Sequence, residues 1–336
     1  MLKKIKKLHL PVKLFIFIDF IIVICFFVVY GPIDNARVFW ITTAMGTNDH
    51  KYLANIFYED DTIKQVMSNN YMDEFSEDTD VGSITIGQEE KITSYTSAYE
   101  KEILDHEEGA LYKLIQFKYN GFDCHMIAIY DPTRVVVGSN KKKNSGRILG
   151  DILKNNNAIL GINGGGYSWA TGYPIGLVVH DSKIVYSSDT KKHVSAAITE
   201  DGVLYVGKLS AKDVKEKKIK EAVSFGPALI VNGKAATFKG NGGSGLNPRT
   251  AMAQRKDGII LFLVVNGYGS KLSFKGRGGV YVTDLIKIFQ RYDAYNAINL
   301  DGGSATTMMI EGKLINDPCN PQKDGQDFIR TAWMLK

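Results

Sequence analysis

Hydrophobic residues follow two distinct patterns along the chain. Residues 14–33, LFIFIDFIIVICFFVVYGPI, contain a single charge, Asp19, and such a run is long enough for a helix to cross a bilayer. In the second half, short apolar runs alternate with turn signals such as Asn120-Gly121 and Asp257-Gly258. That pattern is typical of strands joined by tight turns.

Helical spacing of apolar residues recurs at four places. Residues 53–67 have this spacing approximately, and residues 146–157 predict a short helix. Residues 211–222 are rich in lysine and predict an exposed helix. Residues 279–295 form the strongest amphipathic pattern, with Thr283 as the expected N-cap. Strands, one long helix and further strands predict an α+β (mixed α/β) class, with a large mixed sheet and flanking helices.

The chain is expected to have three parts. Residues 1–33 form a lysine-rich cytoplasmic tip and a transmembrane anchor, residues 34–105 a helical lead-in, and residues 106–336 the main domain. The lysines before the apolar run favour a single-pass cell-membrane protein with a cytoplasmic N-terminus and an extracellular domain. A cleaved signal peptide is the alternative, but the run is long and no A-x-A-like site follows it.

Charge and cysteine content narrow the function classes. The net charge is +5, of which residues 1–33 carry +4, so the remainder is nearly neutral and gives no case for nucleic-acid binding. Cys124 and Cys319 could form a disulfide or stay as two buried thiols. Their surroundings contain no cysteine–histidine spacing of a zinc site.

The segment INLDGGSATTMM places an acid at the end of an apolar strand. Asp301 should therefore point into a crevice where ligands commonly bind. Gly302 and Gly303 allow a sharp turn and close approach of a ligand, while Ser304 and Thr306 offer hydroxyl groups to an anion or a sugar. The alternative is an ordinary Asp-Gly turn.

Two other segments have a similar design. Asn163 ends an apolar run and is followed by Gly164, Gly165 and Gly166, whose N–H groups could cradle an anion; an ordinary glycine-rich loop is equally consistent. Arg249 follows a glycine-rich stretch and presents a planar guanidinium suited to phosphate.

Taken together and in order, these blocks over about residues 110–335 resemble the family of phosphodiester glycosidases related to the uncovering enzyme, N-acetylglucosamine-1-phosphodiester alpha-N-acetylglucosaminidase. The blocks are Asn163–Tyr167, Gly176–Val179, Phe225–Pro227, Asn247–Ala251 and Asn299–Ser304, with Arg330 in a closing block. The anchored N-terminal part is similar to that of Gram-positive members associated with exopolysaccharide production.

The resemblance implies a hydrolase that cleaves a sugar from a sugar-1-phosphodiester on a cell-surface, exopolysaccharide or cell-wall glycan. It implies that Asp301 activates water or stabilises oxocarbenium character, with Arg249 and Asn163 in the catalytic set. Arg330, Asn266 and the glycine-rich backbones would bind substrate. No cofactor is required by the sequence; a divalent cation with oxygen ligands stays open.

One departure from the family pattern keeps other functions open. Asn266-Gly267-Tyr268 stands where relatives often have Asp-Gly-Arg. Loss of that acid and base favours a non-catalytic extracellular module that binds a glycan or an anionic polymer. A phosphodiesterase or transferase that breaks the phosphate–oxygen bond is a third hypothesis.

Overall fold

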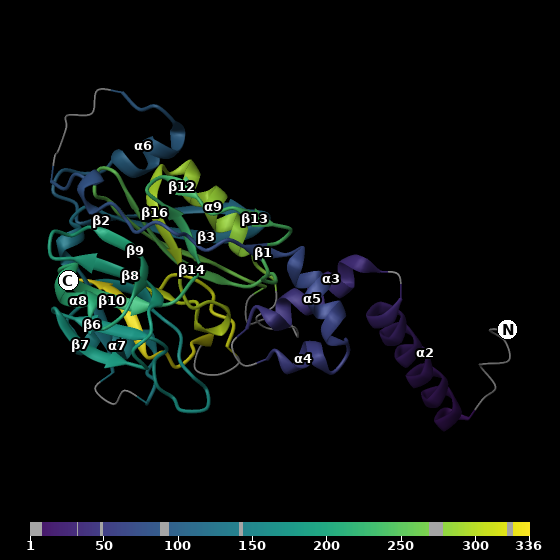
Figure 1. Ribbon diagram of the computed structural model, residues 1–336. Helices are drawn as coiled ribbons and strands as arrows, with labels where there is room; N and C mark the ends of the chain where they lie inside the picture. The colour runs from purple at the N-terminus through teal and green to yellow at the C-terminus, as the bar shows by residue number, and fades with distance from the viewer. Residues whose placement is uncertain are drawn as a thin grey trace. The chain divides into compact units, whose positions relative to one another are not determined.

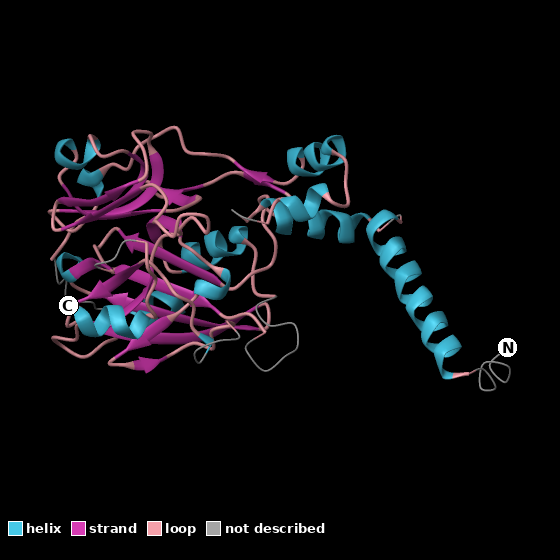
Figure 2. Cartoon of the chain, turned by 90° about the horizontal axis from the view of Figure 1, so that it is seen from below, coloured by secondary structure: helices cyan, strands magenta, loops and turns pink. Residues whose placement is uncertain are grey.

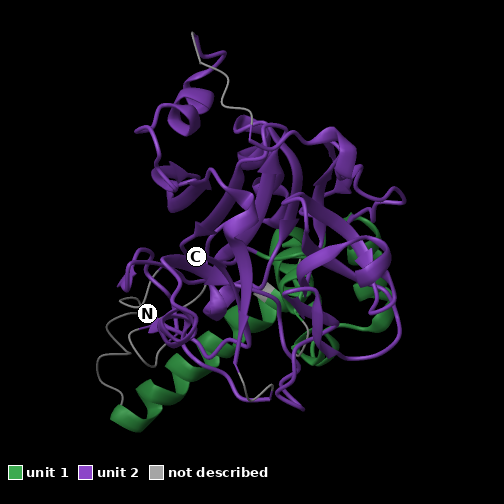
Figure 3. Ribbon diagram, turned by 90° about the vertical axis from the view of Figure 1, so that its left-hand side faces the viewer, with its two compact units in different colours: residues 1–71, 243–245 green, residues 72–242, 246–336 purple. Residues whose placement is uncertain are grey.

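The computed structural model describes residues 9–31, 33–47, 50–87, 94–140, 144–268, 278–320 and 325–336. The chain forms two compact units, residues 1–71 with 243–245 and residues 72–242 with 246–336 (Figure 3). The lysines at positions 3, 4, 6 and 7, on which the expected membrane orientation depends, lie outside the described residues.

The smaller unit begins with a long apolar helix, α2 (Leu10–Tyr30). Its first 18 residues have a mean hydropathy of 2.6, so the helix is long and apolar enough to cross a membrane. A signal sequence would satisfy the same test. The helix starts earlier than the sequence pattern predicts and ends where the Gly31 N–H bonds to the Phe27 carbonyl at 2.9 Å.

Three shorter helices complete the smaller unit: α3 (Asp34–Met45), α4 (Tyr52–Asn55) and α5 (Asp60–Ser68). The expected helical stretch over residues 53–67 is therefore two helices with a turn between them. Buried Ile41, Ala54 and Ile63, one from each helix, form the shared core.

The larger unit is built around a seven-stranded antiparallel sheet (Figure 1). Its strands, in spatial order, are β12 (Lys234–Ala235), β11 (Ala228–Val231), β16 (Ala294–Asn299), β14 (Arg249–Arg255), β15 (Ile260–Val265), β3 (Phe122–Ile129) and β2 (Tyr112–Tyr119). β16, β14 and β15 are buried almost throughout, because both faces of this sheet are covered.

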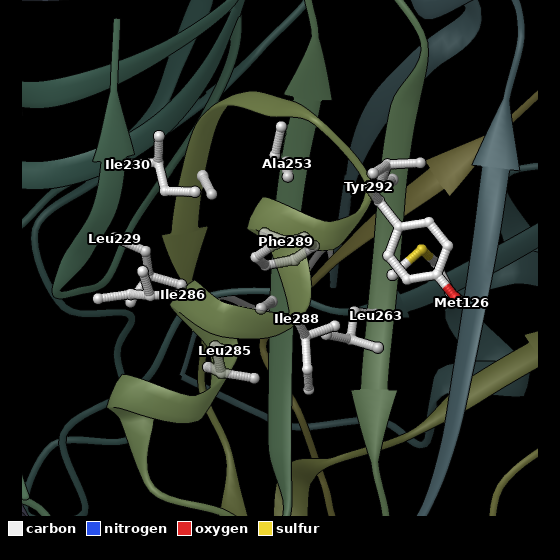
Figure 4. Close-up of a cluster of buried hydrophobic side chains, with 14 of the residues drawn as sticks. Met126, Leu229, Ile230, Ala253, Leu263, Leu285, Ile286, Ile288, Phe289 and Tyr292 are labelled. Carbon is white, nitrogen blue, oxygen red and sulfur yellow. The ribbon is translucent and has the colours of Figure 1, made fainter. Parts of the chain in front are cut away.

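Helix α9 (Val282–Arg291) covers one face of this sheet (Figure 4). Leu285, Ile288 and Phe289 are fully buried against it, as the amphipathic pattern predicts. The predicted N-cap is wrong by two residues. The helix is capped at Tyr281, whose N–H donates to the Asp284 carboxylate at 3.1 Å; a first-turn acid also complements the helix dipole.

Two five-stranded sheets pack on the opposite face (Figure 2). One contains, in spatial order, β7 (Lys183–Ser187), β6 (Leu177–His180), β10 (Ile219–Ser224), β8 (His193–Thr199) and β9 (Leu204–Leu209). The other contains β18 (Lys313–Leu314), β17 (Met308–Ile310), β5 (Leu160–Asn163), β19 (Thr331–Leu335) and β4 (Val135–Ser139). The α+β class is thus confirmed, with the expected large sheet divided into several.

The remaining elements of the chain are short. They are β1 (Tyr71–Met72), β13 (Phe238–Lys239), α6 (Ala98–Leu104), α7 (Leu149–Asn155), α8 (Asp213–Glu216) and the 3-10 turns η1 (Val81–Ser83), η2 (Pro132–Arg134) and η3 (Gly303–Ala305). Helix α7 buries Leu149, Ile152 and Leu153 against the second five-stranded sheet.

The exposed helix expected over the lysine-rich residues 211–222 is wrong for most of its length. Only Asp213–Glu216 is helical, and the chain is extended again from Ile219. Buried Ile219 and Val223 belong to strand β10, which pairs with strands on both sides, β6 and β8. Pairing on two sides outweighs the modest helix propensity of the lysines.

A candidate active site at the ends of two central strands

Asn163 joins three segments that lie far apart in the sequence. Its Nδ2 donates to the backbone carbonyl of Asp301 at 2.6 Å, and its Oδ1 accepts hydrogen bonds from the Thr250 hydroxyl at 2.7 Å and the Thr307 N–H at 3.1 Å. The side chain is fully buried. The end of β5 and the end of β16 are therefore brought together, and Asn163 holds them in place.

Asp301 follows directly from that junction. Its backbone N–H bonds to the Gly164 carbonyl at 3.2 Å. Burial raises the pKa of its carboxyl to about 7, the charge of Asp327 adds to the rise, and a hydrogen bond from the Gly302 N–H opposes it. A carboxyl that titrates near neutrality is a stronger base than an ordinary aspartate, and such perturbed groups are frequent in catalytic sites.

Asp327 supplies a second carboxylate, which the sequence argument missed. Its Oδ2 accepts a hydrogen bond from the Ser304 hydroxyl at 2.6 Å, and its Oδ1 accepts one from the Phe328 N–H at 2.7 Å. Predicted site residue Ser304 thus orients an acid. Two carboxyl groups with different surroundings are the usual means of dividing acid and base roles.

The glycine-rich segment after Asn163 is explained by close backbone approach. A Cβ on Gly165 would lie 2.6 Å from the Ser224 carbonyl oxygen, and one on Gly166 would lie 2.7 Å from the Phe225 ring and 3.8 Å from the Asp301 carboxyl carbon. The N–H groups of Gly164 and Gly165 already donate to the carbonyl and hydroxyl of Thr331. These two donors are engaged within the protein.

Aromatic residues extend the site beyond the carboxylates. Burial raises the pKa of the Tyr167 phenol, the charges of Asp327 and Asp301 raise it further, and the charge of Arg330 opposes the rise. The predicted residue Arg330 places its guanidinium carbon 3.8 Å from the Tyr167 ring centroid. Trp169 stacks on Tyr167 at 6.1 Å with an interplanar angle of 18° and is 66% exposed.

Tyr167, Trp169, Asp327 and Arg330 line a pocket of about 490 Å³. Asp301 is not among its lining residues and lies near two of them, Tyr167 and Asp327. Its charged and aromatic lining residues are Arg147, Asp151, Tyr167, Trp169, Asp327, Phe328 and Arg330. The volume lies within the usual range for small-molecule sites. We call this hollow the site pocket.

The two arginines of the site pocket differ in their bonding. Arg330 donates from Nε to the Gly172 carbonyl at 2.7 Å and from an Nη to the Phe328 carbonyl at 3.0 Å, so it also holds the 167–174 loop. Arg147 is exposed, and its guanidinium makes no hydrogen bond or ion pair within the described part of the chain. Its backbone pairs with Ile329, next to Arg330.

Arg249 has a different position from the one that its motif suggested. Its side chain is buried, donates from Nε to the Val280 carbonyl at 3.1 Å and lies near Asp284. Along β14 its neighbour Thr250 faces Asn163, so Arg249 leaves the sheet on the α9 side. Burial lowers the pKa of its guanidinium to about 10, and the group remains cationic at neutral pH.

Asn266 and Thr306 lie in the supporting structure around the site. The Asn266 Oδ1 accepts a hydrogen bond from the Asp317 N–H at 3.3 Å. The Cys319 thiol, two residues further, donates to the Gly303 carbonyl at 3.5 Å. The Thr306 hydroxyl is buried with no hydrogen-bond partner among the described residues.

The structure also bears on the metal site and the disulfide that the sequence left open. Within the described ranges no group of three or more His, Cys, Asp or Glu side chains could hold a metal ion. Cys124 and Cys319 are both buried and are not joined by a disulfide.

A family model described as phosphodiester glycosidase matches residues 156–335. The chain belongs to this family. The matched region includes Asn163, Asp301, Asp327 and Arg330, whereas Arg147 precedes it.

Curated relatives are distant and longer than the matching region. N-acetylglucosamine-1-phosphodiester alpha-N-acetylglucosaminidase of Mus musculus is 26% identical over 179 residues, which is 48% of this chain and 34% of that protein. The Bos taurus protein of the same name is 27% identical over 48% of this chain and 33% of its own length. An uncharacterised prophage-derived protein of Bacillus subtilis is 26% identical, covering 56% of this chain and 29% of its own. This chain thus spans about a third of the relatives' length.

A solved structure has the same fold. It is the zebrafish N-acetylglucosamine-1-phosphodiester alpha-N-acetylglucosaminidase catalytic domain, auto-inhibited by its pro-peptide, with a TM-score of 0.56 and 22% identity over 68% of this chain and 85% of that one.

Two site-pocket residues escaped the sequence reasoning for different reasons. Asp327 lies three positions before Arg330 in the block DFIRTAWML, so an acid beside an expected phosphate ligand was a usable signal. Arg147 carries no local signal, because only the pairing of its backbone with Ile329 brings it to the pocket.

Proposed function

We propose that this family member is a hydrolase that releases a sugar from a sugar-1-phosphodiester bound in the site pocket, with Asp301 beside the pocket-lining residues Tyr167 and Asp327. The observation that carries the proposal is the pair of neighbouring carboxyl groups at Asp301 and Asp327, the second of which lines the site pocket with two arginines and an exposed tryptophan. Family membership supports the same reaction class.

The phosphate would lie near Arg147. An exposed guanidinium presents a planar fork of N–H donors that matches phosphate oxygens. Arg330, with part of its donors bound to loop carbonyls, would add positive charge while it keeps Tyr167 in place. The sugar would lie toward Trp169, since the electron-rich face of an indole attracts the polarised C–H groups of a pyranose.

The reaction would proceed by attack of water on the sugar C1. Asp301 in its ionised form takes a proton from the water, the new C1–O bond forms, and the bond between C1 and the phosphate oxygen breaks with its electron pair leaving on the phosphate. The departing phosphomonoester has a second pKa of about 6, so it needs little acid assistance. Asp327, held by Ser304, would maintain the raised pKa of Asp301.

The test is product analysis with the full chain in lipid nanodiscs. N-acetylglucosamine 1-(methyl phosphate) and glucose 1-(methyl phosphate) serve as probes, and the expected products are free sugar and methyl phosphate. Asp301→Asn should abolish the release. Asp201→Asn, which removes an exposed carboxylate in a turn between β8 and β9, is the matched control and should have no effect.

Other products would contradict the proposal. Sugar 1-phosphate and methanol would indicate cleavage on the phosphorus side. Binding of the probe without release of any product would indicate the binding module, for which the Asn266-Gly267-Tyr268 departure is the argument.

We also propose that helix α2 anchors the enzyme in the cell membrane, with the glycosidase unit outside and a surface glycan as substrate. Its length and hydropathy support this. Two results would contradict this proposal. One is extraction of the chain from membranes by alkaline carbonate. The other is degradation of the large unit by protease only after the membrane has been permeabilised.

A further inference from the structure

A second hollow lies beside the site pocket and has a different chemical character. It measures about 980 Å³ and lies between helix α7, strand β17 and the start of β2. Its apolar lining consists of Ala110, Leu111, Ile148, Leu153, Ala158, Ile159 and Met309. We call this hollow the apolar groove.

The apolar groove and the site pocket meet at the start of α7. Ile148 and Asp151 line both hollows. Arg147, the cation to which the phosphate is assigned above, directly precedes Ile148 in the chain. A group attached to a phosphate at Arg147 therefore has the apolar groove as its neighbouring space.

A phosphodiester necessarily carries a second substituent. The sugar occupies one ester oxygen, and an alcohol occupies the other. With the sugar at Trp169 and the phosphate at Arg147, the alcohol would extend past Ile148. We infer that this alcohol is an apolar chain of several carbons that lies in the apolar groove. The inference rests on the proposed function and specifies its substrate class.

The lining favours an apolar chain over a sugar polymer. A glycan needs hydrogen-bond partners along its length, but the charged residues of the groove, Asp151, Lys154 and Glu311, are exposed at its rim. Glu311 also already accepts a hydrogen bond from the Tyr112 hydroxyl at 3.0 Å.

The size of the groove favours a small molecule over a protein partner. A hollow of about 980 Å³ is at the upper end of small-molecule sites, whereas protein interfaces are usually broad and rather flat surfaces. The apolar walls belong to three separate elements that are fixed by the cores of the large unit, so the groove does not depend on a partner to form.

The first experiment compares two substrates that differ only in the alcohol. The full chain in nanodiscs is given N-acetylglucosamine 1-(methyl phosphate) or its 1-(octyl phosphate) analogue below the concentration at which the latter self-associates. A fully buried methylene contributes about fourfold in affinity. Because the groove is open along one side, we expect an increase in kcat/KM of about tenfold over the seven added carbons.

Variants that fill the groove provide the specific test. Ala158→Trp and Ala110→Trp introduce bulk at two different walls and should remove the octyl preference while methyl-phosphate hydrolysis is kept. Ala98→Trp, at an exposed position on α6, is the matched control. It should keep the preference. An octyl preference that persisted in the two groove variants as well would come from partition of the octyl group into the nanodisc and would overturn the groove assignment.

Product inhibition gives a readout that needs no variant. Octyl phosphate should inhibit hydrolysis of the methyl substrate at a concentration about tenfold lower than methyl phosphate does. Equal inhibition by the two products, or equal kcat/KM for the two substrates in the wild-type chain, would overturn the apolar-alcohol assignment and leave the hydrolase intact. Release of no sugar from either substrate would overturn both proposals.

Discussion

Replacement of Asp301 by asparagine should abolish catalysis and, above neutral pH, stabilise the fold. Burial, followed by the Asp327 charge, raises the pKa of this carboxyl from 3.8 to about 7. Between these two values the folded state holds a proton that the unfolded state has released, so the wild-type free energy of unfolding falls as pH rises through this window. Below about pH 4 both states are protonated and the penalty disappears.

The size of the effect follows from the shift. About three pKa units correspond to at most about 4 kcal/mol. Asp301 is partly exposed, and solvent screening reduces this to about 1–2 kcal/mol. Asparagine carries no charge at any of these pH values, so Asp301→Asn should raise Tm at pH 8 by about 2–8 °C and change it little at pH 4.

The assay is thermal unfolding of the full chain in nanodiscs, followed by tryptophan fluorescence at pH 4, 6 and 8. Trp333 is fully buried in the larger unit and reports its unfolding. Asp201→Asn is the control and should give the same small change at every pH. If Asp301→Asn lowered Tm at pH 8, or shifted it equally at pH 4 and pH 8, the carboxyl would not be held in an unfavourable ionised state and the reasoning would be refuted.

Three further results are expected. The acid limb of the kcat/KM profile is expected near pH 7, from the ionisation of Asp301. Asp327→Asn should move this limb to lower pH by about one unit or less, since burial is the larger cause of the raised pKa. An unchanged limb would exclude an effect of the Asp327 charge on Asp301. Arg147→Ala should raise KM for a methyl phosphodiester by about tenfold or more. Arg134→Ala, just before the start of β4, is the control, and equal increases in KM for the two variants would exclude a phosphate role for Arg147. Asn163→Ala removes three buried hydrogen bonds and should lower the urea-unfolding free energy by about 3 kcal/mol or more, whereas a loss below about 1 kcal/mol would show that the strand ends are held by other contacts.

The sequence by itself determined the class of the fold and the positions of the chemically important segments. Alternation and turn signals predicted strands joined by tight turns, and helical periodicity predicted α9, because both depend on local patterns that repeat along the chain. The blocks at Asn163 and Asp301 were visible because an acid or amide followed by glycines at a strand end is a local feature.

Only the tertiary structure decided what each side chain does. Asn163 was expected in the catalytic set, and its three hydrogen bonds hold the backbone of the site. Arg249 faces α9 because β14 alternates, and the register that sets its face depends on pairing with β15 and β16. Arg147 reaches the site pocket through one bridge to Ile329. Contacts between residues more than a hundred positions apart leave no periodic mark in a single sequence, so burial, pairing and pKa had to come from the folded chain.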